Sequence, residues 1–518
     1  MLDETAIVEV AQGRLQGIRR GGVSIFKGVP YGGRVEAGAR FLPAPPAGPW
    51  SRTRSALSYG APSLQNNTDY PAWIDSRVGA ENCLFLNVWS PDTSGKRAVM
   101  VWIHGGGYSS GSGGLPIYDG AALAKRGDVV VVTVNHRLNI FGYLHLAAID
   151  PHYATSGNVG QLDLVLALQW VAKNISALGG DPANVTLFGE SGGGAKISAL
   201  MAMPAAQGLF HKAIIESGSA LSVMTPEAAE RTARAVLGHF DFVPTKVEKL
   251  QSIPAEKLLA GYVQLSSGGP AAGGQRVEFA PVVDGISIPT QTWTPAAPEL
   301  SRHIPLLVGT NHDETVAFID QGMFDPPADD AALRIRIKRV AVFAAPLNDR
   351  DVDVLIARYR HQWPSASRLD LLVRISTDVG MRGNAILQAA RQLAHGAPVF
   401  MYEFDWPTPC FGGKWALHGI EIPFVFGNLD YGSAWDGHDT TAGRAAADPH
   451  GVRFRLAAQT LGAWAAFART GNPSHAGLPT WRPYSLDRRE TMALGAVSEL
   501  QADPRRENRL LIENGLHA

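Results

Sequence analysis

The chain of 518 residues contains only two cysteines, Cys83 and Cys410, which lie far apart. Two thiols in so long a chain make no disulfide framework, and they lack metal-type spacing such as C-x-x-C. This scarcity favours a reducing compartment, so we expect a cytoplasmic protein. The first residues, Met1 to Glu4, also lack the positive start and apolar run of a secretion signal. A secreted protein whose signal had been removed would begin in the same way.

Long apolar runs and an excess of one charge are also missing. Apolar runs are interrupted well before the roughly 18 residues that a membrane-spanning helix needs, so we predict no membrane span. Lys and Arg total 46 and Asp and Glu 47, which predicts no basic surface for nucleic acid. Hydrophobic residues make up 45% of the chain, enough for a large core and unlike the composition of disordered proteins.

Short β-branched apolar runs alternate with stretches of helical periodicity over much of the chain. Runs bounded by polar residues or glycine are typical of buried strands, and broad apolar stripes are typical of covering helices. Their alternation predicts an α/β fold with a mainly parallel central sheet flanked by helices. The predicted strands are Ala98–Ile103, Val129–Val134, Val185–Phe188, Ile304–Val308 and Ala397–Phe404, and the predicted helices are Gln161–Ile175 and Ile197–Met203.

One region departs from this alternation. Residues 316–394 are richer in Arg, Asp and Ala, with helical patterning and few strand signals. They are predicted to form a mostly helical insertion or cap. The Gly- and Ser-rich residues 266–274 read as a loop rather than a domain boundary. We therefore predict a single unit over residues 1–518.

The run Gly189-Glu190-Ser191-Gly192-Gly193 follows a predicted strand and precedes a predicted helix. A serine between glycines at such a turn fits the nucleophile elbow, G-x-S-x-G, in which only small neighbours leave room for a strained backbone. The helix N-terminus beyond it offers N–H groups where an oxyanion would form. A packing turn is the alternative. A phosphate loop is excluded because Ala195 stands where that motif needs lysine.

A second glycine run, His104-Gly105-Gly106-Gly107, directly follows the predicted strand that ends at Ile103. Three consecutive glycines cost backbone entropy, and close approach of main-chain N–H groups to a substrate would justify that cost. We predict an oxyanion hole made by the N–H groups of Gly106, Gly107 and Gly192. A flexible turn is the alternative, and the presence of both motifs makes each more specific.

The base and the acid cannot be chosen from residues alone. Hydrolases with this elbow carry the serine first, then the acid, then the histidine. The chain has 15 histidines, so many candidates follow Ser191.

Motifs along almost the whole chain make it similar to the type-B carboxylesterase and cholinesterase-like family of α/β-hydrolases, in its bacterial form. The resemblance implies the α/β-hydrolase fold and hydrolysis of carboxylic esters by one catalytic unit. The matching runs are Phe26-Lys27-Gly28-Val29-Pro30-Tyr31, Glu81-Asn82-Cys83-Leu84, His104-Gly105-Gly106-Gly107, Asn135-His136-Arg137-Leu138, Gly157-Asn158-Val159-Gly160-Gln161, Phe188-Gly189-Glu190-Ser191-Gly192, Gly309-Thr310-Asn311-His312-Asp313-Glu314, His418-Gly419-Ile420-Glu421 and Arg469-Thr470-Gly471-Asn472-Pro473.

By that resemblance the catalytic residues are Ser191, Glu314 and His418. Asp313 competes with Glu314 for the role of the acid, and the match favours Glu314. Glu190 either takes part beside the imidazole or only hydrogen-bonds within the elbow. The chemistry would pass through an acyl-enzyme, with His418 taking the serine proton. It requires no metal and no organic cofactor, and we expect a monomer or small homo-oligomer.

The resemblance also carries expectations about the scaffold. Arg40 is expected to pair with Glu81, and Arg137 with Asp163, as structural clamps. Relatives often pair the cysteine matching Cys83 with one upstream, which this chain lacks, so Cys83 should be a free, buried thiol. Gly192 replaces the more usual alanine, and Asn82 replaces aspartate.

Two alternative functions remain open at this stage. A non-catalytic adhesion or binding protein of the same fold would have lost a catalytic residue, and none is lost here. A hydrolase or transferase acting on amides or lactones would use the same site. The expected partner is a small-molecule ester. Some aromatic residues near the motifs could line its pocket or could be ordinary packing: Tyr70, Trp73, Phe141, Phe318 and Phe411.

Overall fold

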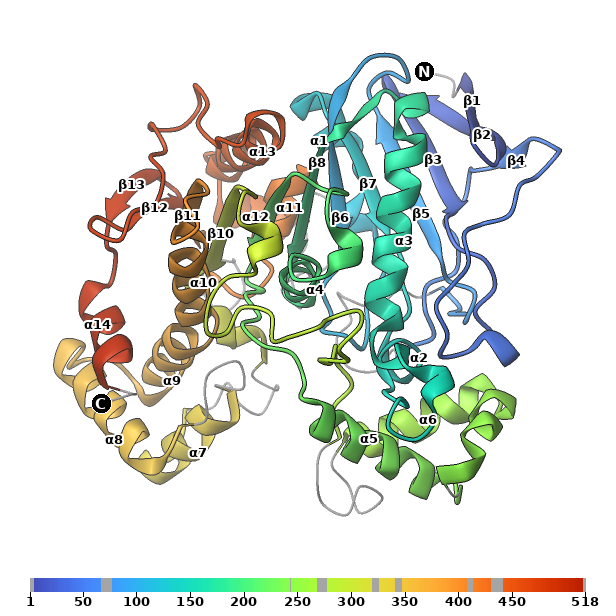
Figure 1. Ribbon diagram of the computed structural model, residues 1–518. Helices are drawn as coiled ribbons and strands as arrows, with labels where there is room; N and C mark the ends of the chain where they lie inside the picture. Colours follow the sequence, from blue (N-terminus) through green and yellow to red (C-terminus); the bar gives the residue numbers. More distant parts are fainter. Residues whose placement is uncertain are drawn as a thin grey trace.

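The computed structural model describes residues 4–66, 77–242, 244–267, 277–318, 326–340, 347–407, 413–429 and 441–515. Its centre is one 13-stranded sheet, with strand order β1-β2-β3-β5-β7-β6-β8-β9-β10-β11-β12-β13 and β4 paired to β2. Figure 1 shows this sheet crossing the molecule, with helices in front of it and behind it. The neighbours β7, β6, β8, β9, β10, β11 and β12 are all parallel.

The predicted strands all form in this parallel part. The prediction is confirmed for each, with ends shifted by a few residues, as is usual when boundaries are read from apolar runs. The five predicted strands are β6 (Arg97–Ile103), β7 (Val130–Val134), β8 (Gly180–Glu190), β10 (Leu306–Asn311) and β11 (Val399–Asp405). Two more parallel strands, β9 (Lys212–Glu216) and β12 (Glu490–Gly495), were not predicted.

The two edges of the sheet consist mainly of antiparallel pairs, which were not predicted from the sequence; the short β4 pairs with β2 in parallel. One edge is formed by β1, β2, β3 and β5, and the other by β13 against β12. Polar residues are interspersed in β1, β2 and β13 because these strands are partly open to solvent, whereas β3 and β5 are largely buried. Their bounds are β1 (Glu4–Val10), β2 (Gly13–Arg20), β3 (Val23–Pro30), β4 (Arg54–Ser55), β5 (Phe85–Ser90) and β13 (Glu499–Ala502).

Alternate residues of the central strands enter two separate cores. Val99 and Val101 pack with α3 (Val159–Asn174), α4 (Gly192–Leu200) and α10 (Gly383–Leu393). Met100 and Trp102 pack on the other face with three further helices, as the two-residue period of a strand requires. Those helices are α1 (Ala121–Gly127), α11 (Ile422–Phe426) and α13 (Val452–Thr470).

The helix predicted over Ile197–Met203 is longer and earlier than expected. It is α4, which begins at Gly192, directly after Ser191. The prediction started it late because Gly192 to Gly194 have low helix propensity. Close approach of other backbone segments, described below, explains why glycines are needed there.

Between β10 and β11 the described residues form helices and connecting loops, with no strand. These helices include α7 (Asp330–Val340), α8 (Asp349–Gln362), α9 (Arg368–Thr377), a π-helical turn at Asp378–Arg382, and α10. Figure 1 shows α7 and α8 below the sheet and α10 against it. The remaining helices are α2 (Asn139–Tyr143), α5 (Pro226–His239), α6 (Ala255–Ser266), α12 (Thr441–Ala447) and α14 (Arg506–Gly515).

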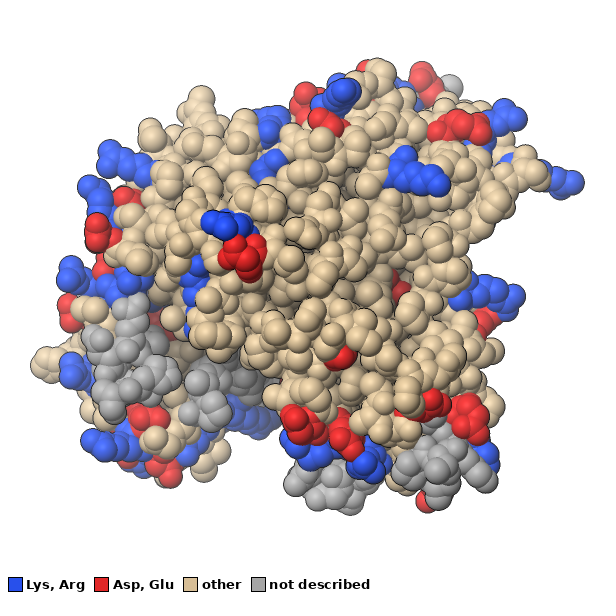
Figure 2. All heavy atoms as spheres, in the orientation of Figure 1, with Lys and Arg blue, Asp and Glu red and all other residues tan. Residues whose placement is uncertain are grey.

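The sequence predicted no membrane-spanning helix and no basic surface. No helix within the described residues is both long enough and apolar enough to cross a membrane. On the face shown in Figure 2, basic and acidic side chains are interspersed, and neither sign forms a broad patch.

Candidate active site

The candidate residues lie beyond the carboxyl ends of adjacent parallel strands. His104 follows β6, Ser191 follows β8, Ser217 follows β9, and Glu314 follows β10. Because β6, β8, β9 and β10 are neighbours in this order, their carboxyl ends meet at one edge of the sheet. This is where open α/β sheets bind their ligands.

Ser191 occupies a strained turn between β8 and α4. Its φ and ψ angles are 53° and −122°, in a region that non-glycine residues rarely adopt. The Ser191 N–H donates to the Glu216 carbonyl at 2.8 Å, and its own carbonyl accepts from Ala195 N–H at 3.0 Å. Both bonds hold the turn in place, which is the geometry expected of a nucleophile elbow.

The glycine run after β6 adopts a backbone conformation that favours glycine. Gly106 and Gly107 have φ angles of 83° and 60°, in the left-handed region that favours glycine. A Cβ atom at Gly106 would lie 2.5 Å from the Ser110 carbonyl oxygen. The close turn therefore excludes any side chain at Gly106.

The glycine run and the elbow touch each other. A Cβ atom at Gly192 would lie 2.2 Å from the Gly107 carbonyl oxygen and 2.5 Å from its Cα. The structure thus brings together the three residues predicted for an oxyanion hole, Gly106, Gly107 and Gly192. It also explains why glycine replaces the more usual alanine after Ser191: the loop occupies the space of a methyl group.

His418 lies between two buried carboxylates. Its Nδ1 is 2.5 Å from Glu314 Oε2, and its Nε2 is 3.0 Å from Glu190 Oε1. All three side chains are almost fully buried. Glu190, whose part the sequence left open, is therefore within hydrogen-bonding distance of the imidazole, next to Ser191 in the chain.

Adjacent carboxylates on the acid loop face different partners. Asp313 Oδ1 is 3.0 Å from His312 Nδ1, and Asp313 Oδ2 accepts from Ala416 N–H at 3.1 Å. Glu314 alone of the two faces His418. The structure therefore separates the two candidates that the sequence could not separate by spacing.

Further polar groups, which were not predicted from the sequence, orient Glu314. Ser217 Oγ and Asn311 N–H donate to Glu314 Oε1 at 2.5 and 2.7 Å. Asn311 Nδ2 also donates to Glu421 Oε2 at 2.6 Å. Polar residues directly after apolar strands were the available signal, because Ser217 follows β9 and Asn311 ends β10.

Burial raises the pKa values of several carboxyl groups in this site. It raises the pKa of Glu190, although the nearby His418 opposes the shift. It raises the pKa of Glu216 to about 8, despite the hydrogen bond that Glu216 accepts from Trp464. The pKa of Glu421 is also well above its ordinary value, first by burial and then by repulsion from Glu190. Such perturbed carboxyls in one place are typical of functional sites.

The imidazole responds in the opposite way to burial. Burial alone would lower the pKa of His418, but attraction to Glu190 and Glu314 outweighs it and raises the pKa well above 6.5. The two carboxylates therefore stabilise the imidazolium form, which is what a base must become after it accepts a proton.

The expected scaffold contacts are confirmed. Arg40 Nε lies 2.6 Å from Glu81 Oε1, and Arg137 Nη2 lies 2.7 Å from Asp163 Oδ1. Cys83 is a free, fully buried thiol, and burial raises its pKa to about 12. A protonated, inaccessible thiol has a packing role.

None of the aromatic residues suggested as pocket lining is placed at the site by the described residues. Phe141, in α2, is buried in a third core, with the Arg40 guanidinium 5.8 Å from its ring centre. Phe141 is therefore a packing residue. Tyr70, Trp73 and Phe411, like Cys410, lie outside the described residues, as does the side chain of Phe318.

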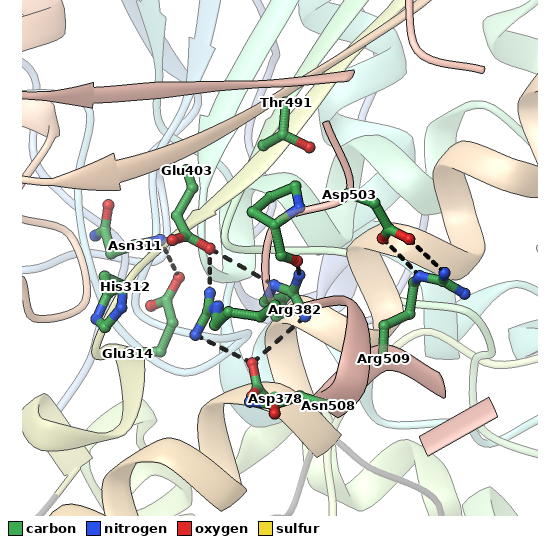
Figure 3. Close-up of polar contacts among 12 residues, drawn as sticks. Asn311, His312, Glu314, Asp378, Arg382, Glu403, Thr491, Asp503, Asn508 and Arg509 are labelled. Atoms are coloured by element: carbon green, nitrogen blue, oxygen red, sulfur yellow. Dashed lines mark hydrogen bonds and ion pairs between the residues drawn. The ribbon is translucent and has the colours of Figure 1, made fainter. Parts of the chain in front are cut away.

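A second group of buried charges lies beside β10 and β11 (Figure 3). Arg505 pairs with Asp378, at 3.1 Å, and with Glu403. Arg382 lies 3.5 Å from each of the same two carboxylates. We call these four residues the C-terminal cluster, because Arg505 precedes the last helix, α14. It ties that helix to β11 and to the π-helical turn.

Comparison with known proteins agrees with this architecture. Residues 4–510 match the Carboxylesterase family. The chain is 37% identical to the para-nitrobenzyl esterase of Bacillus subtilis, over 97% of each chain. It is 33% identical to the phenmedipham hydrolase of Pseudarthrobacter oxydans, over 94% of this chain and 95% of that protein.

Solved structures give the same result. The fold matches a crystal structure of a carboxylesterase from Geobacillus stearothermophilus with a TM-score of 0.80 and 35% identity, over 97% of this chain and 99% of that one. The predicted α/β-hydrolase fold is therefore confirmed. The chain belongs to the carboxylesterase family and is a carboxylic ester hydrolase.

Proposed function

We propose that Ser191 is the nucleophile of this ester hydrolase, with His418 as its base and Glu314 as the acid that orients the base. The observation that carries the proposal is the 2.5 Å contact of Glu314 with His418 Nδ1. The other imidazole nitrogen lies 3.0 Å from Glu190, the residue that directly precedes Ser191 in the elbow. A carboxylate on Nδ1 keeps the proton there and leaves Nε2 as the proton acceptor.

In the first half-reaction, Ser191 Oγ attacks the ester carbonyl carbon while its proton passes to His418 Nε2. The N–H groups of Gly106, Gly107 and Gly192 stabilise the oxygen that becomes negative. Collapse of this intermediate breaks the bond to the alcohol, which leaves with the proton from His418. The acyl group stays on Ser191 as an ester.

In the second half-reaction, water repeats the attack. His418 takes a proton from the water, and the acyl–serine bond breaks to release the carboxylic acid. The proton on His418 then returns to Ser191 Oγ. Glu190, 3.0 Å from His418 Nε2, adds a second charge that favours the imidazolium in both steps. No metal or organic cofactor takes part in this proposal.

We propose small neutral esters as substrates, beginning with para-nitrobenzyl esters. Support comes from the name of the Bacillus subtilis relative. We also propose that residues 1–518 act as one catalytic unit with residues 316–394 as its helical cap. The position of α7 to α10 between Glu314 and His418 supports this assignment. A bacterial source, a cytoplasmic location and a monomeric or small homo-oligomeric state stay predictions.

Covalent labelling tests the nucleophile directly. A fluorophosphonate should attach one phosphonyl group per chain and abolish ester hydrolysis in proportion. Peptide mass mapping should place the group on Ser191. Stoichiometric labelling of another serine, with the same loss of activity, would overturn the proposal.

A further inference from the structure

A fully buried lysine, Lys196, lies in α4, the helix that begins directly after Ser191. Its Nζ donates to the Gly107 carbonyl at 2.7 Å and to the His104 carbonyl at 3.1 Å. These carbonyls stand at the two ends of the glycine run. One side chain therefore holds both ends of the loop that carries the proposed oxyanion N–H groups.

The carbonyls between these ends are also held. The Gly105 carbonyl accepts from His104 Nδ1 at 2.9 Å. The Gly106 carbonyl accepts from the N–H groups of Ser109 and Ser110 at 3.2 and 3.0 Å. With four successive carbonyls bonded, the peptide planes between them have fixed orientations, and so do their N–H groups. The donors from His104, Ser109 and Ser110 are neighbours of these glycines in the chain, whereas Lys196 donates from α4.

The contact between the loop and the elbow depends on the same region of α4. The missing side chain at Gly192 lets Gly107 approach it closely. Lys196 binds the same Gly107 from the next turn of that helix. The helix thus provides both the space for the loop and the donor that keeps the loop in that space.

We propose that Lys196 is a positioning residue for ester hydrolysis, which holds the Gly105–Gly107 loop against Gly192 so that the oxyanion N–H groups are correctly placed. The proposal rests on the assignment of Ser191 and the oxyanion hole above. Lys196 acts through the loop and does not itself touch the substrate.

The role requires N–H donors rather than a fixed charge. Burial lowers the pKa of Lys196 to about 7, against the attraction of Glu190. Besides Glu190, the groups near Lys196 are His104, His136 and the Tyr108 ring, whose centre is 5.7 Å from Nζ. Both the ammonium and the neutral amine have enough hydrogens to bind two carbonyls, so the loop stays held on either side of neutral pH.

The main test is Lys196→Met, which keeps the bulk of the side chain and removes its donors. Displacement of the loop by even about 1 Å can cost about 100-fold in rate. We expect kcat per labelled Ser191 to fall about 10- to 100-fold, while KM changes less than about threefold. A trifluoromethyl ketone, whose adduct places an oxyanion in the hole, should bind more weakly by the same factor as kcat/KM falls.

Two further variants separate this role from a loss of stability. Lys212→Met removes another largely buried lysine, at the start of β9, whose Nζ binds Asn184. It should lower the melting temperature without changing kcat per labelled site. Lys196→Gln has donors but a shorter reach, so about a fivefold to tenfold loss of kcat is expected from weaker placement of the loop. This variant also serves if Lys196→Met does not fold.

Gly192→Ala tests the same placement from the other side. The added methyl group should displace Gly107, lower kcat, and weaken the ketone by a similar factor. Combined with Lys196→Met, it should cause less than the product of the two losses, because both changes displace one loop. If folded Lys196 variants label at Ser191 but keep wild-type kcat and ketone affinity, the role of Lys196 is wrong. Labelling elsewhere would instead overturn the assignment of Ser191.

Discussion

Two clusters of buried ionisable groups differ in the balance of acids and bases. The catalytic cluster places one imidazole, His418, among Glu190, Glu216, Glu314 and Glu421. The C-terminal cluster pairs two carboxylates, Asp378 and Glu403, with two guanidinium groups, Arg382 and Arg505 (Figure 3). The clusters are close neighbours in the sheet, because Glu403 of β11 is paired with Thr310 of β10, just before the acid loop.

This difference appears in the acidity of the carboxyls. Burial opposes ionisation of Glu403, but Arg505, His312 and Arg382 outweigh it and hold its pKa below the ordinary value. Burial likewise opposes ionisation of Asp378, and Arg505 and Arg382 lower its pKa. In the catalytic cluster the pKa values of Glu190, Glu216 and Glu421 are raised instead. Carboxyl groups that are paired with guanidinium groups stay ionised. Where buried carboxyl groups outnumber the bases, their pKa values rise and some of them can take up or release a proton near neutral pH.

Ser191→Ala should give the largest effect and act on activity alone. Without the nucleophile, kcat for a p-nitrophenyl ester should fall about 10⁴- to 10⁶-fold. The melting temperature should change little, because no buried charge loses its partner. Steady-state kinetics and thermal unfolding of the same preparation measure both. Turnover near the wild-type rate would contradict the assignment.

Glu314→Gln should cause the next largest loss of kcat. The amide can no longer stabilise the imidazolium on Nδ1, and a similar change in another hydrolase costs about 10⁴-fold in kcat. We expect a loss of about 10³- to 10⁴-fold. Asp313→Asn is the matched control, since Asp313 faces His312, and it should cost less than tenfold. Equal losses would mean that the acid role is shared.

Arg505→Met should lower the free energy of unfolding and leave the rate of ester hydrolysis almost unchanged. It leaves Asp378 and Glu403 buried with one cation between them, and breaking a buried ion pair costs about 3–5 kcal/mol. The denaturation midpoint should fall clearly, while kcat of the folded fraction stays within about twofold. Arg506→Met, at a side chain that is 68% exposed, should leave the midpoint unchanged. A large loss of kcat in folded Arg505→Met would show that the clusters are coupled.

The sequence predicted the parts of the molecule in which local signals agree with the fold. Apolar runs predicted the central strands, and the two glycine motifs predicted the elbow and the loop. Family resemblance, rather than spacing, selected Glu314 and His418. The antiparallel edges were missed because polar residues interrupt their apolar runs and their partners are set by the register of the sheet.

Contacts between distant segments that the family resemblance did not imply could not be predicted. The approach of Gly192 to Gly107, the bond from Ser217 to Glu314 and the two carbonyls bound by Lys196 join residues that lie far apart in the chain. A lysine in an apolar helical stretch would ordinarily read as a solvent-facing residue. Only the fold shows that it is buried beside the proposed oxyanion loop.

The smallest predicted effect is a shift in pH dependence. The base must be neutral to accept the serine proton, so kcat/KM should fall as pH falls through the pKa of His418. Because Glu190 and Glu314 raise this pKa above 6.5, the midpoint of the fall should lie above pH 6.5. Glu190→Gln removes one of the two attracting charges and should move the midpoint about 1 pH unit lower.

Glu216→Gln is the matched control for this shift. The pKa of Glu216 is about 8, so below that pH it is mostly protonated and has little charge to remove. Its carboxyl binds Trp464 rather than His418. We expect the midpoint to move by less than half the shift of Glu190→Gln. Equal shifts would mean that the imidazole responds to the total charge of the catalytic cluster. An upward shift in Glu190→Gln would contradict the attraction between Glu190 and His418, because removing an attracting carboxylate can only make the imidazole easier to deprotonate.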